Sequence, residues 1–228
     1  MSHHTFAITL AGVAVAAAVA GVSMWFDEER RVRRKLNSLA PRSSLQVAEG
    51  EFIRLDGTVR APLGTPLRGV TEPIEYGIAC AIDVTRYDGH GKNRRSSVVA
   101  KSRETIPFML ELEDGALVRV SAPTRVAFGQ ARLSDKGILW QQSTIFDEFL
   151  AKHQQDSVKL AGAEELKVSE RLIAAGDRVL VAGTARWEED PDGKLLEDGY
   201  RGATRAKRLV LDDAIVALNL EFHQAARV

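Results

Sequence analysis

The sequence predicts a mainly β protein, an antiparallel β-barrel with one helix, preceded by a single N-terminal transmembrane helix. Three observations predict this class. Apolar and polar residues alternate through most of the chain after residue 47. One amphipathic segment, 143–160, interrupts the alternation. Residues 5–26 contain no charged residue. We therefore expect an anchor at 1–26, a basic juxtamembrane linker at 27–46 and a barrel domain at 47–228.

Residues 5–26 are expected to form the anchor. A helix rises about 1.5 Å per residue, so this segment spans roughly 30 Å, the thickness of one hydrocarbon core. Trp25 and Phe26 stand where an interfacial aromatic belt lies. A cleaved signal peptide is the alternative, because "AVAG" at 18–21 offers a cleavage site. Signal peptides carry their positive charge before the apolar run, however, and here it follows, which favours a retained anchor.

The basic segment 27–46 is expected to form a short helix or linker that ends before Pro41. By the positive-inside rule, the N-terminus faces outside and the rest of the chain lies in the cytoplasm. The basic side chains either contact anionic headgroups or serve only to set this topology. They are Arg30, Arg31, Arg33, Arg34 and Lys35.

Period-two alternation predicts the strands of the domain at 47–228. Hairpin turns are indicated at 87–93 and 113–115, where glycine follows aspartate. Many short sequential strands favour a barrel, because a barrel leaves no unpaired edge. The predicted strands are 51–61, 74–87, 96–106, 108–114, 116–122, 166–173, 177–187, 202–211 and 214–222.

The segment 143–160 predicts the single helix, across or beside the barrel. Thr144 and Asp147 give it an N-terminal capping signature. Four apolar residues at i, i+4 spacing form the face that should be buried. These are Ile145, Phe146, Phe149 and Leu150, and their expected partners are Val179, Val181 or neighbouring strand residues.

The stretch "EGEFIRLDGTV…PLGTPLRGVTEPIEYGIACAIDV" at 49–84 resembles the opening of the GIDE or BAM (beside-a-membrane) domain family. That family is known from membrane-anchored ubiquitin ligases of the MULAN type and has short bacterial members. It opens with a glycine-framed strand, a Pro-Leu-x-x-Pro-Leu-x-Gly loop and a long strand. The segments at 107–126 and 169–187 resemble its next hairpin and its Gly-Asp-x-Val-x-Val-x-Gly strand pair, which recurs in OB-like barrels. The residues that match the loop are Pro62, Leu63, Pro66, Leu67 and Gly69.

The loop at 61–73 allows two interpretations. Leu63 and Leu67 could fold back and plug one end of the barrel, with the prolines limiting the entropy of the loop. Alternatively, the loop could be an exposed docking surface. We expect the plug, because each leucine follows a proline in the same local geometry.

The resemblance implies that the domain binds a partner, but this sequence lacks the zinc ligands on which the ubiquitin transfer of the ligases depends. In the ligases a RING follows the domain, and it holds two zinc ions with four Cys or His ligands each. One cysteine and five histidines cannot supply them. We therefore expect a membrane-anchored, non-enzymatic binding or scaffold module that presents its barrel to a cytoplasmic protein partner. The alternative is a component of a ubiquitin-transferase-like or other enzyme complex whose catalytic part lies on another chain.

No motif predicts a catalytic residue, a cofactor or a metal. Cys80 lies mid-strand between alanines and is expected to be a buried structural thiol. His90 and His153 have no partner at metal-ligand spacing. The stretch "EEDPDGK" at 188–194 begins like a calcium loop, but Gly199 stands where the bidentate Glu is needed, which favours a plain turn.

The balance of charge argues against nucleic acid as a partner. The chain has 31 basic and 31 acidic residues, and only 6% of its residues are aromatic. A local basic stretch, "RGATRAKR" at 201–208, either forms a solvated strand face or contacts an anionic partner such as the lipid surface. Its residues on one strand face are Arg201, Arg205 and Lys207.

Overall fold

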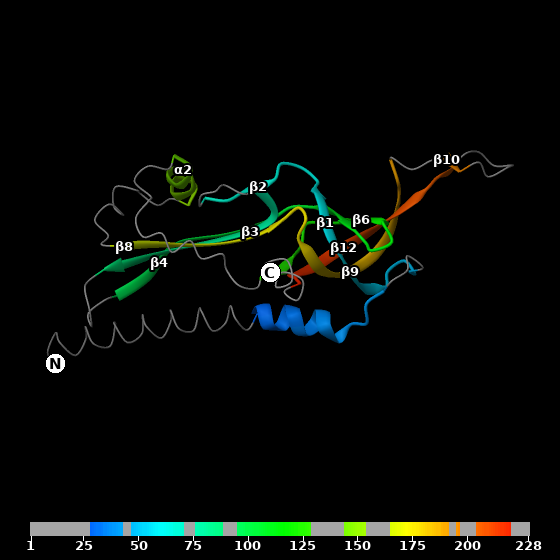
Figure 1. Cartoon of the computed structure of the whole chain (residues 1–228), viewed down its shortest axis with the longest axis horizontal. Coiled ribbons are helices and arrows are strands. Elements are labelled where there is room, and N and C mark those ends of the chain that lie inside the picture. Colours follow the sequence, from blue (N-terminus) through cyan, green and yellow to red (C-terminus); the bar gives the residue numbers. More distant parts are fainter. Residues whose placement is uncertain are drawn as a thin grey trace, which may run out of the picture.

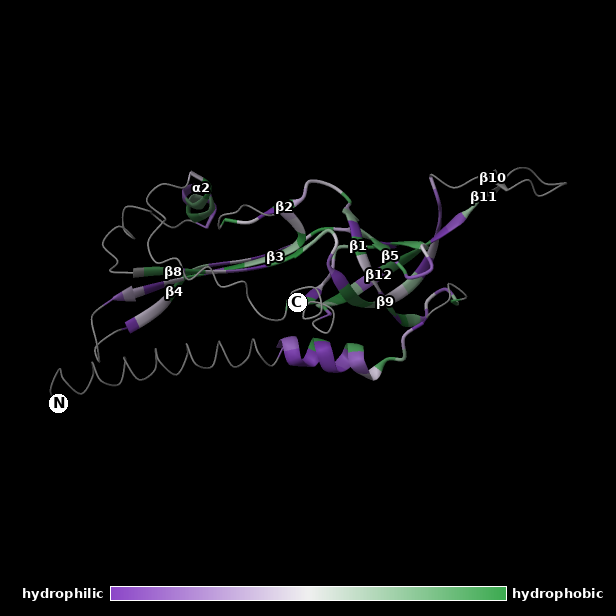
Figure 2. Cartoon of the chain, viewed as in Figure 1, coloured by the Kyte–Doolittle hydropathy of each residue, from purple (hydrophilic) through white to green (hydrophobic). Residues whose placement is uncertain are grey.

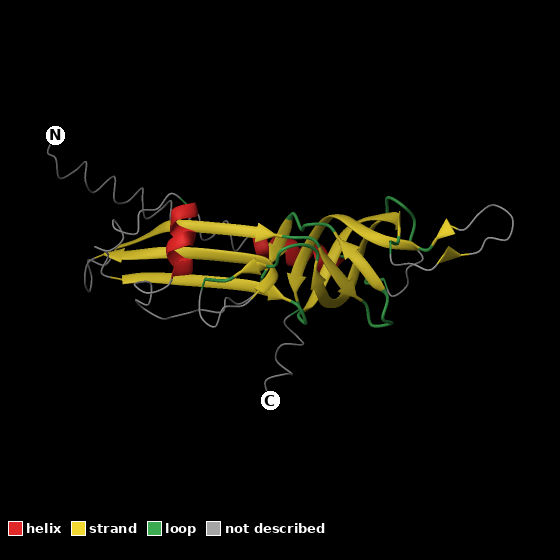
Figure 3. Ribbon diagram, turned by 90° about the horizontal axis from the view of Figure 1, so that it is seen from above, coloured by secondary structure: helices red, strands yellow, loops and turns green. Residues whose placement is uncertain are grey.

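The structure is a computed structural model that describes residues 28–42, 47–70, 76–88, 95–128, 144–153, 165–191, 195–196 and 204–219. A closed barrel forms one end of the molecule, a long sheet extends from it, and two helices pack on the outside (Figures 1 and 3). The predicted anchor at 5–26 lies outside the described residues. Within the described ranges, no helix is both long and apolar enough to cross a membrane.

Five strands close the barrel in the order β6-β5-β1-β9-β12, and β12 pairs again with β6. Alternation along each strand sends every second side chain inward. In β9, Val179 and Val181 lie in the barrel core, whereas Leu180 and Ala182 point outward. The predicted barrel is confirmed. Its strands are β1 (Phe52–Pro62), β5 (Phe108–Glu111), β6 (Leu117–Val120), β9 (Arg178–Glu189) and β12 (Lys207–Leu218).

The β6–β12 pair that closes the barrel is parallel, which the sequence does not predict. A short strand, β7 (Arg125–Ala127), also pairs in parallel with the later half of β12. β12 pairs with β9 along one edge, and on its other edge the partner changes from β6 to β7. The change occurs at an irregularity between Asp212 and Ile215, where Asp213 adopts a positive φ of 49°. Aspartate tolerates this conformation better than most residues, and such bulges bend a strand. The bend lets β12 close the barrel with its first half and hold β7 with its second.

A second sheet extends from the barrel as an arm (Figure 1). Its central strand is β3 (Tyr76–Asp88), flanked by β4 (Arg95–Thr105) and β8 (Glu165–Ala174). The short β2 (Leu67–Arg68) pairs with the start of β3. The prediction that all strands of residues 47–222 share one barrel is therefore wrong. Alternation predicts which face of a strand is buried, but it carries no information on the strand's partner.

β3 belongs to both units because its first half is apolar on both faces. Ala79 and Ala81 pack in the barrel core, while Cys80 and Ile82 pack in the core of the arm. A continuous apolar run of this kind is typical of a strand that is buried on both sides.

The helix α2 (Thr144–Lys152) lies across the arm (Figure 3). Three of its four predicted apolar residues are buried, and Ile145 is half-buried. The expected contact with Val179 and Val181 is wrong, because both valines face the barrel core and α2 packs on the core of the arm instead. The rest of the predicted helix, 154–160, lies outside the described residues. The buried three are Phe146, Phe149 and Leu150.

Residues 28–38 form a second helix, which packs on the outer wall of the barrel (Figure 1). Val32 and Leu36, one turn apart, are buried in a cluster with outward-facing residues of β9 and β12. The side of this helix that faces away from the barrel is hydrophilic (Figure 2). The predicted basic linker is thus partly a helix docked on the barrel, and it ends before Pro41 as expected.

The loop between β1 and β2 does not plug the barrel. Leu67 packs against the core of the arm, and Leu63 is half-buried, its backbone nitrogen donating to the carbonyl of Pro107 at 2.8 Å. β3 and β8 instead contribute Ile78 and Ile173 to the barrel core, where the arm leaves the barrel. The expected plug is therefore wrong for Leu67, because the arm already fills this position.

Candidate binding pocket

A pocket of about 400 Å³ lies between the β1–β2 loop, the arm sheet and α2. Its floor is apolar and includes Val70, Cys80, Ile82 and Phe149. This volume is within the range of ligand sites, which combine apolar walls with a few polar groups. The other lining residues are Thr65, Pro66, Leu67, Arg68, Ser102, Glu104, Ile145, Glu148 and Lys152.

A buried carboxylate fixes the loop that forms one wall of the pocket. The backbone nitrogen of Val70 donates to Oε2 of Glu170 at 2.7 Å, and Glu170 is only 6% exposed. Gly69 lies so close that a Cβ there would come within 2.3 Å of Oε1 of Glu170. A Cβ at position 69 would therefore displace the end of the Glu170 side chain, which is buried and accepts the hydrogen bond of Val70, so glycine favours this close approach.

The opposite wall carries a charged pair at the rim. Nζ of Lys152, in the last turn of α2, donates to Oε1 of Glu104 on β4 at 2.6 Å. Oγ of Ser102 donates to the same oxygen at 3.3 Å. The hydrogen bond from Lys152 is the main reason that the pKa of Glu104 is held below its usual value. The pair connects α2 to the edge of the sheet.

The thiol in the floor is not a nucleophile. Cys80 is buried, and burial, with the nearby charges of Glu170 and Glu104, raises its pKa to about 12. A thiol with this pKa stays protonated at neutral pH, whereas thiolates carry out the chemistry of reactive cysteines. The prediction of a buried thiol is confirmed.

The structure places the predicted loop residues on different sides of this wall. Pro66 and Leu67 line the pocket, and Gly69 lies behind it against Glu170. Pro62 ends β1, and Leu63 is half-buried outside the pocket lining.

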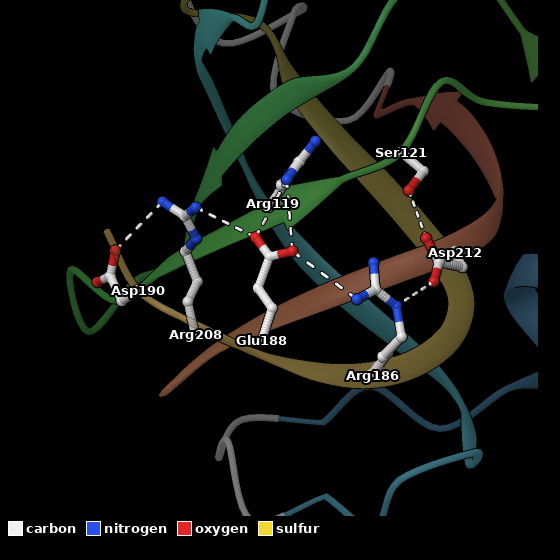
Figure 4. Close-up of polar contacts among 7 residues, drawn as sticks. All are labelled: Arg119, Ser121, Arg186, Glu188, Asp190, Arg208 and Asp212. Atoms are coloured by element: carbon white, nitrogen blue, oxygen red, sulfur yellow. Dashed lines mark hydrogen bonds and ion pairs between the residues drawn. The ribbon is translucent and has the colours of Figure 1, made fainter. Parts of the chain in front are cut away.

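A second polar cluster covers the outer face of the barrel across β6, β9 and β12 (Figure 4). Arg119 and Arg208 each donate to Oε1 of Glu188 at 3.2 Å. Burial acts to raise the pKa of Glu188, but the hydrogen bonds and charges of these arginines outweigh it and hold the pKa low. Nε of Arg186 donates to Asp212 at 2.7 Å. The full cluster is Arg119, Ser121, Arg186, Glu188, Asp190, Arg208 and Asp212.

This cluster links neighbouring strands of the barrel by ion pairs, and it is not a binding site for an anion. Its three arginines are matched by three carboxylates, so it carries no net charge. Glu188 and Asp190, the first and third residues of the calcium-like stretch, bind arginines. Among the described residues, no three His, Cys, Asp or Glu side chains come together as metal ligands.

The basic residues of the helix 28–38 divide into two groups. Nη1 of Arg33 donates to the carbonyl of Leu218 at 3.1 Å, and Nζ of Lys35 lies 4.4 Å from the ring centroid of Phe52. These two therefore contact the domain itself. The other group is Arg30, Arg31 and Arg34, which are exposed; Lys35 is exposed too, despite its contact with Phe52.

Of the second predicted basic set, the structure describes the side chain of Lys207 alone. Arg201 and the side chain of Arg205 lie outside the described residues. Lys207 is exposed at the start of β12, next to Glu189 of β9 in the sheet.

A buried arginine joins the helix 28–38 to the arm. Arg171 of β8 has a side chain that is only 4% exposed; its Nη1 donates to Glu29 at 3.3 Å and its Nη2 to Asp83 at 2.9 Å. Burial raises the pKa of Glu29 and lowers that of Arg171, while their mutual attraction opposes both shifts. A second pair, Glu28 with Arg103 at 3.8 Å, lies at the same end of the helix. These contacts fix the helix relative to the arm.

Sequence reasoning missed Glu170, Arg171 and the Glu104–Lys152 pair. One signal was present, since Glu170 and Arg171 are adjacent charges in the middle of a predicted strand. Neighbouring residues of a strand point to opposite faces, so in a sheet covered on both faces at least one of them must be buried and paired. The partners come from segments far away in the sequence, and no pattern along the chain identifies them.

No family model, curated protein or solved structure matches this chain. The resemblance to the GIDE family therefore stays a prediction.

Proposed function

We propose that the protein is a membrane-anchored, non-enzymatic binding module whose binding site is the pocket beneath α2. The observation that carries the proposal is the pocket itself, with an apolar floor and a polar rim on well-packed elements. Such a site binds an apolar group on its floor and orients the rest of the ligand with the rim. The proposed ligand is an apolar side chain of a protein partner.

The chemistry of the pocket supports binding over catalysis. The Cys80 thiol has a pKa of about 12 and stays protonated at neutral pH. Glu104 is held charged by Lys152, which makes it a weak proton acceptor. A general base needs a pKa near the working pH, and this pair provides none.

The sequence supplies the membrane part of the proposal. Residues 5–26 are uncharged, and by the positive-inside rule the basic residues that follow support a topology with the N-terminus outside and the barrel in the cytoplasm. The motifs that resemble the GIDE family agree with an OB-like barrel beside a membrane. A Greek-key barrel of five strands is the architecture of OB domains, which commonly bind ligands.

Site-specific photo-crosslinking in cells tests the pocket. A photoreactive phenylalanine derivative replaces Glu148 on the rim or, as the matched control, Ala151 on the exposed side of α2. We expect a protein adduct from position 148 only. A further change, Thr65→Trp, places a large ring over the pocket and should abolish the adduct without lowering the melting temperature. Equal adducts from both positions, or an adduct that survives Thr65→Trp, would contradict the proposal.

A further inference from the structure

We propose that the outward face of the helix 28–38 docks on an anionic lipid surface, so that this helix lies between the barrel and the bilayer. The inference rests on the proposed membrane anchor and adds the orientation of the domain.

One side of the helix packs against the rest of the domain. Val32 and Leu36 are buried on the barrel wall, and Glu29 is buried against Arg171. At the margins, Arg33 donates to backbone carbonyls of Leu218 and Ala127. Since residues on one side of a helix recur every three or four positions, the intervening positions face away from the barrel.

The side that faces away is basic and open. It holds Arg30, Arg31 and Arg34 with Asn37 and Ser38, all exposed. Across the described ranges, no carboxylate lies within ion-pair distance of these three arginines. Arg34 makes one hydrogen bond, to the carbonyl of Arg30 in its own helix. The guanidinium groups are thus available to an external anion.

Position in the chain selects the lipid surface among possible anions. Residue 28, the first described residue of the helix, follows the uncharged segment 5–26 closely in the sequence, so an anchored chain holds these arginines beside the headgroups. Figure 2 shows the hydrophilic side of the helix turned away from the barrel. The clamp of Arg171 with Glu29 and Asp83 transmits this orientation to the arm. Docking of the helix therefore orients the pocket relative to the membrane.

The lipid contact should shift the equilibrium towards the docked helix by a measurable factor. Each arginine near an anionic surface is expected to favour the docked state roughly fivefold, so three favour it roughly a hundredfold. The effect should weaken with salt, because screening shortens the range of these interactions.

The test uses the full chain in lipid nanodiscs of phosphatidylcholine, alone or mixed with phosphatidylserine. A donor dye is attached at Asn37→Cys on the helix or at Leu117→Cys on β6, which lies on the side of the barrel away from the helix (Figure 1). The native thiol, Cys80, is buried and does not compete for the dye. Energy transfer to acceptor-labelled headgroups reports the distance of each site from the membrane.

We expect strong transfer from position 37 in anionic discs, weaker transfer in neutral discs, and little from position 117 in either. Neutralising the outward arginines should reduce the transfer to the neutral-disc level. A charge-matched control at exposed basic residues elsewhere should leave it unchanged. The two triple variants are Arg30→Gln with Arg31→Gln and Arg34→Gln, and Arg60→Gln with Arg95→Gln and Lys207→Gln.

The outcomes separate this inference from the proposed function. Transfer from position 37 that is insensitive to lipid charge, as an acidic protein partner of the helix predicts, overturns the lipid contact alone. An equal loss in both triple variants overturns it too. A chain that does not enter the discs contradicts the anchor and the docked helix together.

Discussion

Replacement of Arg171 by methionine tests how the helix 28–38 is held against the arm. Methionine keeps most of the side-chain volume but removes the charge that faces Glu29 and Asp83. Asp83 still has Lys101 at 3.9 Å. Glu29 is 7% exposed and loses its nearest cation. We therefore expect most of the damage at Glu29.

The cost follows from leaving a buried carboxylate without its partner. Breaking a buried ion pair on one side costs about 3–5 kcal/mol, because the remaining charge stays desolvated. The guanidinium also lies 5.8 Å from the ring centroid of Phe128, a contact of about 0.5–1 kcal/mol. We expect the free energy of unfolding to fall by about 3–5 kcal/mol at neutral pH.

The pH dependence identifies Glu29 as the cause. Burial already raises the pKa of Glu29 in the folded state, and removal of Arg171 raises it further. A folded pKa above the unfolded value means that the folded state keeps the proton longer, so stability falls as the pH rises between the two values. The destabilisation of Arg171→Met should therefore shrink as the pH is lowered towards the usual pKa of glutamate.

Urea unfolding of the full chain in mild detergent, followed by tryptophan fluorescence, measures this effect. The double variant Glu29→Gln, Arg171→Met is the control, and it should recover part of the loss at neutral pH because no charge is left buried. A loss below about 1 kcal/mol for Arg171→Met, the range of an exposed pair, or a loss that does not change with pH, would refute the reasoning.

Three further predictions concern the loop, the thiol and the outer face of the barrel. Leu67→Ala should lower the free energy of unfolding by about 1–2 kcal/mol in urea, less than the 2–5 of a fully buried leucine, because Leu67 is half-buried on the core of the arm; no loss would mean that the loop is detached. Cys80 should resist thiol reagents at mildly alkaline pH until the protein is unfolded, since its pKa is about 12, and rapid labelling of the folded protein would contradict this. Hydrogen bonds, chiefly from Arg186, hold the pKa of Asp212 low, so its contribution is present above the unfolded pKa of about 4 and is lost as the pH falls through the lower folded value. Asp212→Asn should therefore flatten the acid-unfolding curve, and an unchanged curve would contradict the assignment.

The candidate pocket was only partly predictable. The sequence singled out the loop with Pro66, Leu67 and Gly69, and two of these residues line the pocket. It did not indicate the role of Gly69, because the carboxylate of Glu170 that lies against this glycine comes from a strand far along the chain. Five basic residues of one helix looked equivalent in sequence. Packing on the barrel divides them, because Arg33 and Lys35 lie at the margins of the buried side.

The sequence by itself determined most of the segments that become strands, which faces of them are buried, and that 144–152 forms an amphipathic helix. It divided β12 into two strands, 202–211 and 214–222, and did not indicate β7. These properties follow from local periodicity, since side chains alternate in a strand and recur every 3.6 residues in a helix. Only the tertiary structure decided which strands share a sheet. β3 enters both cores because Ala79 and Cys80 each find apolar partners on opposite faces, and those partners come from distant segments. The parallel closure of the barrel likewise depends on the bend at Asp213 and on a β6 strand far away in the sequence. Pairing between distant segments is set by the packing of the whole domain, and local periodicity cannot express it.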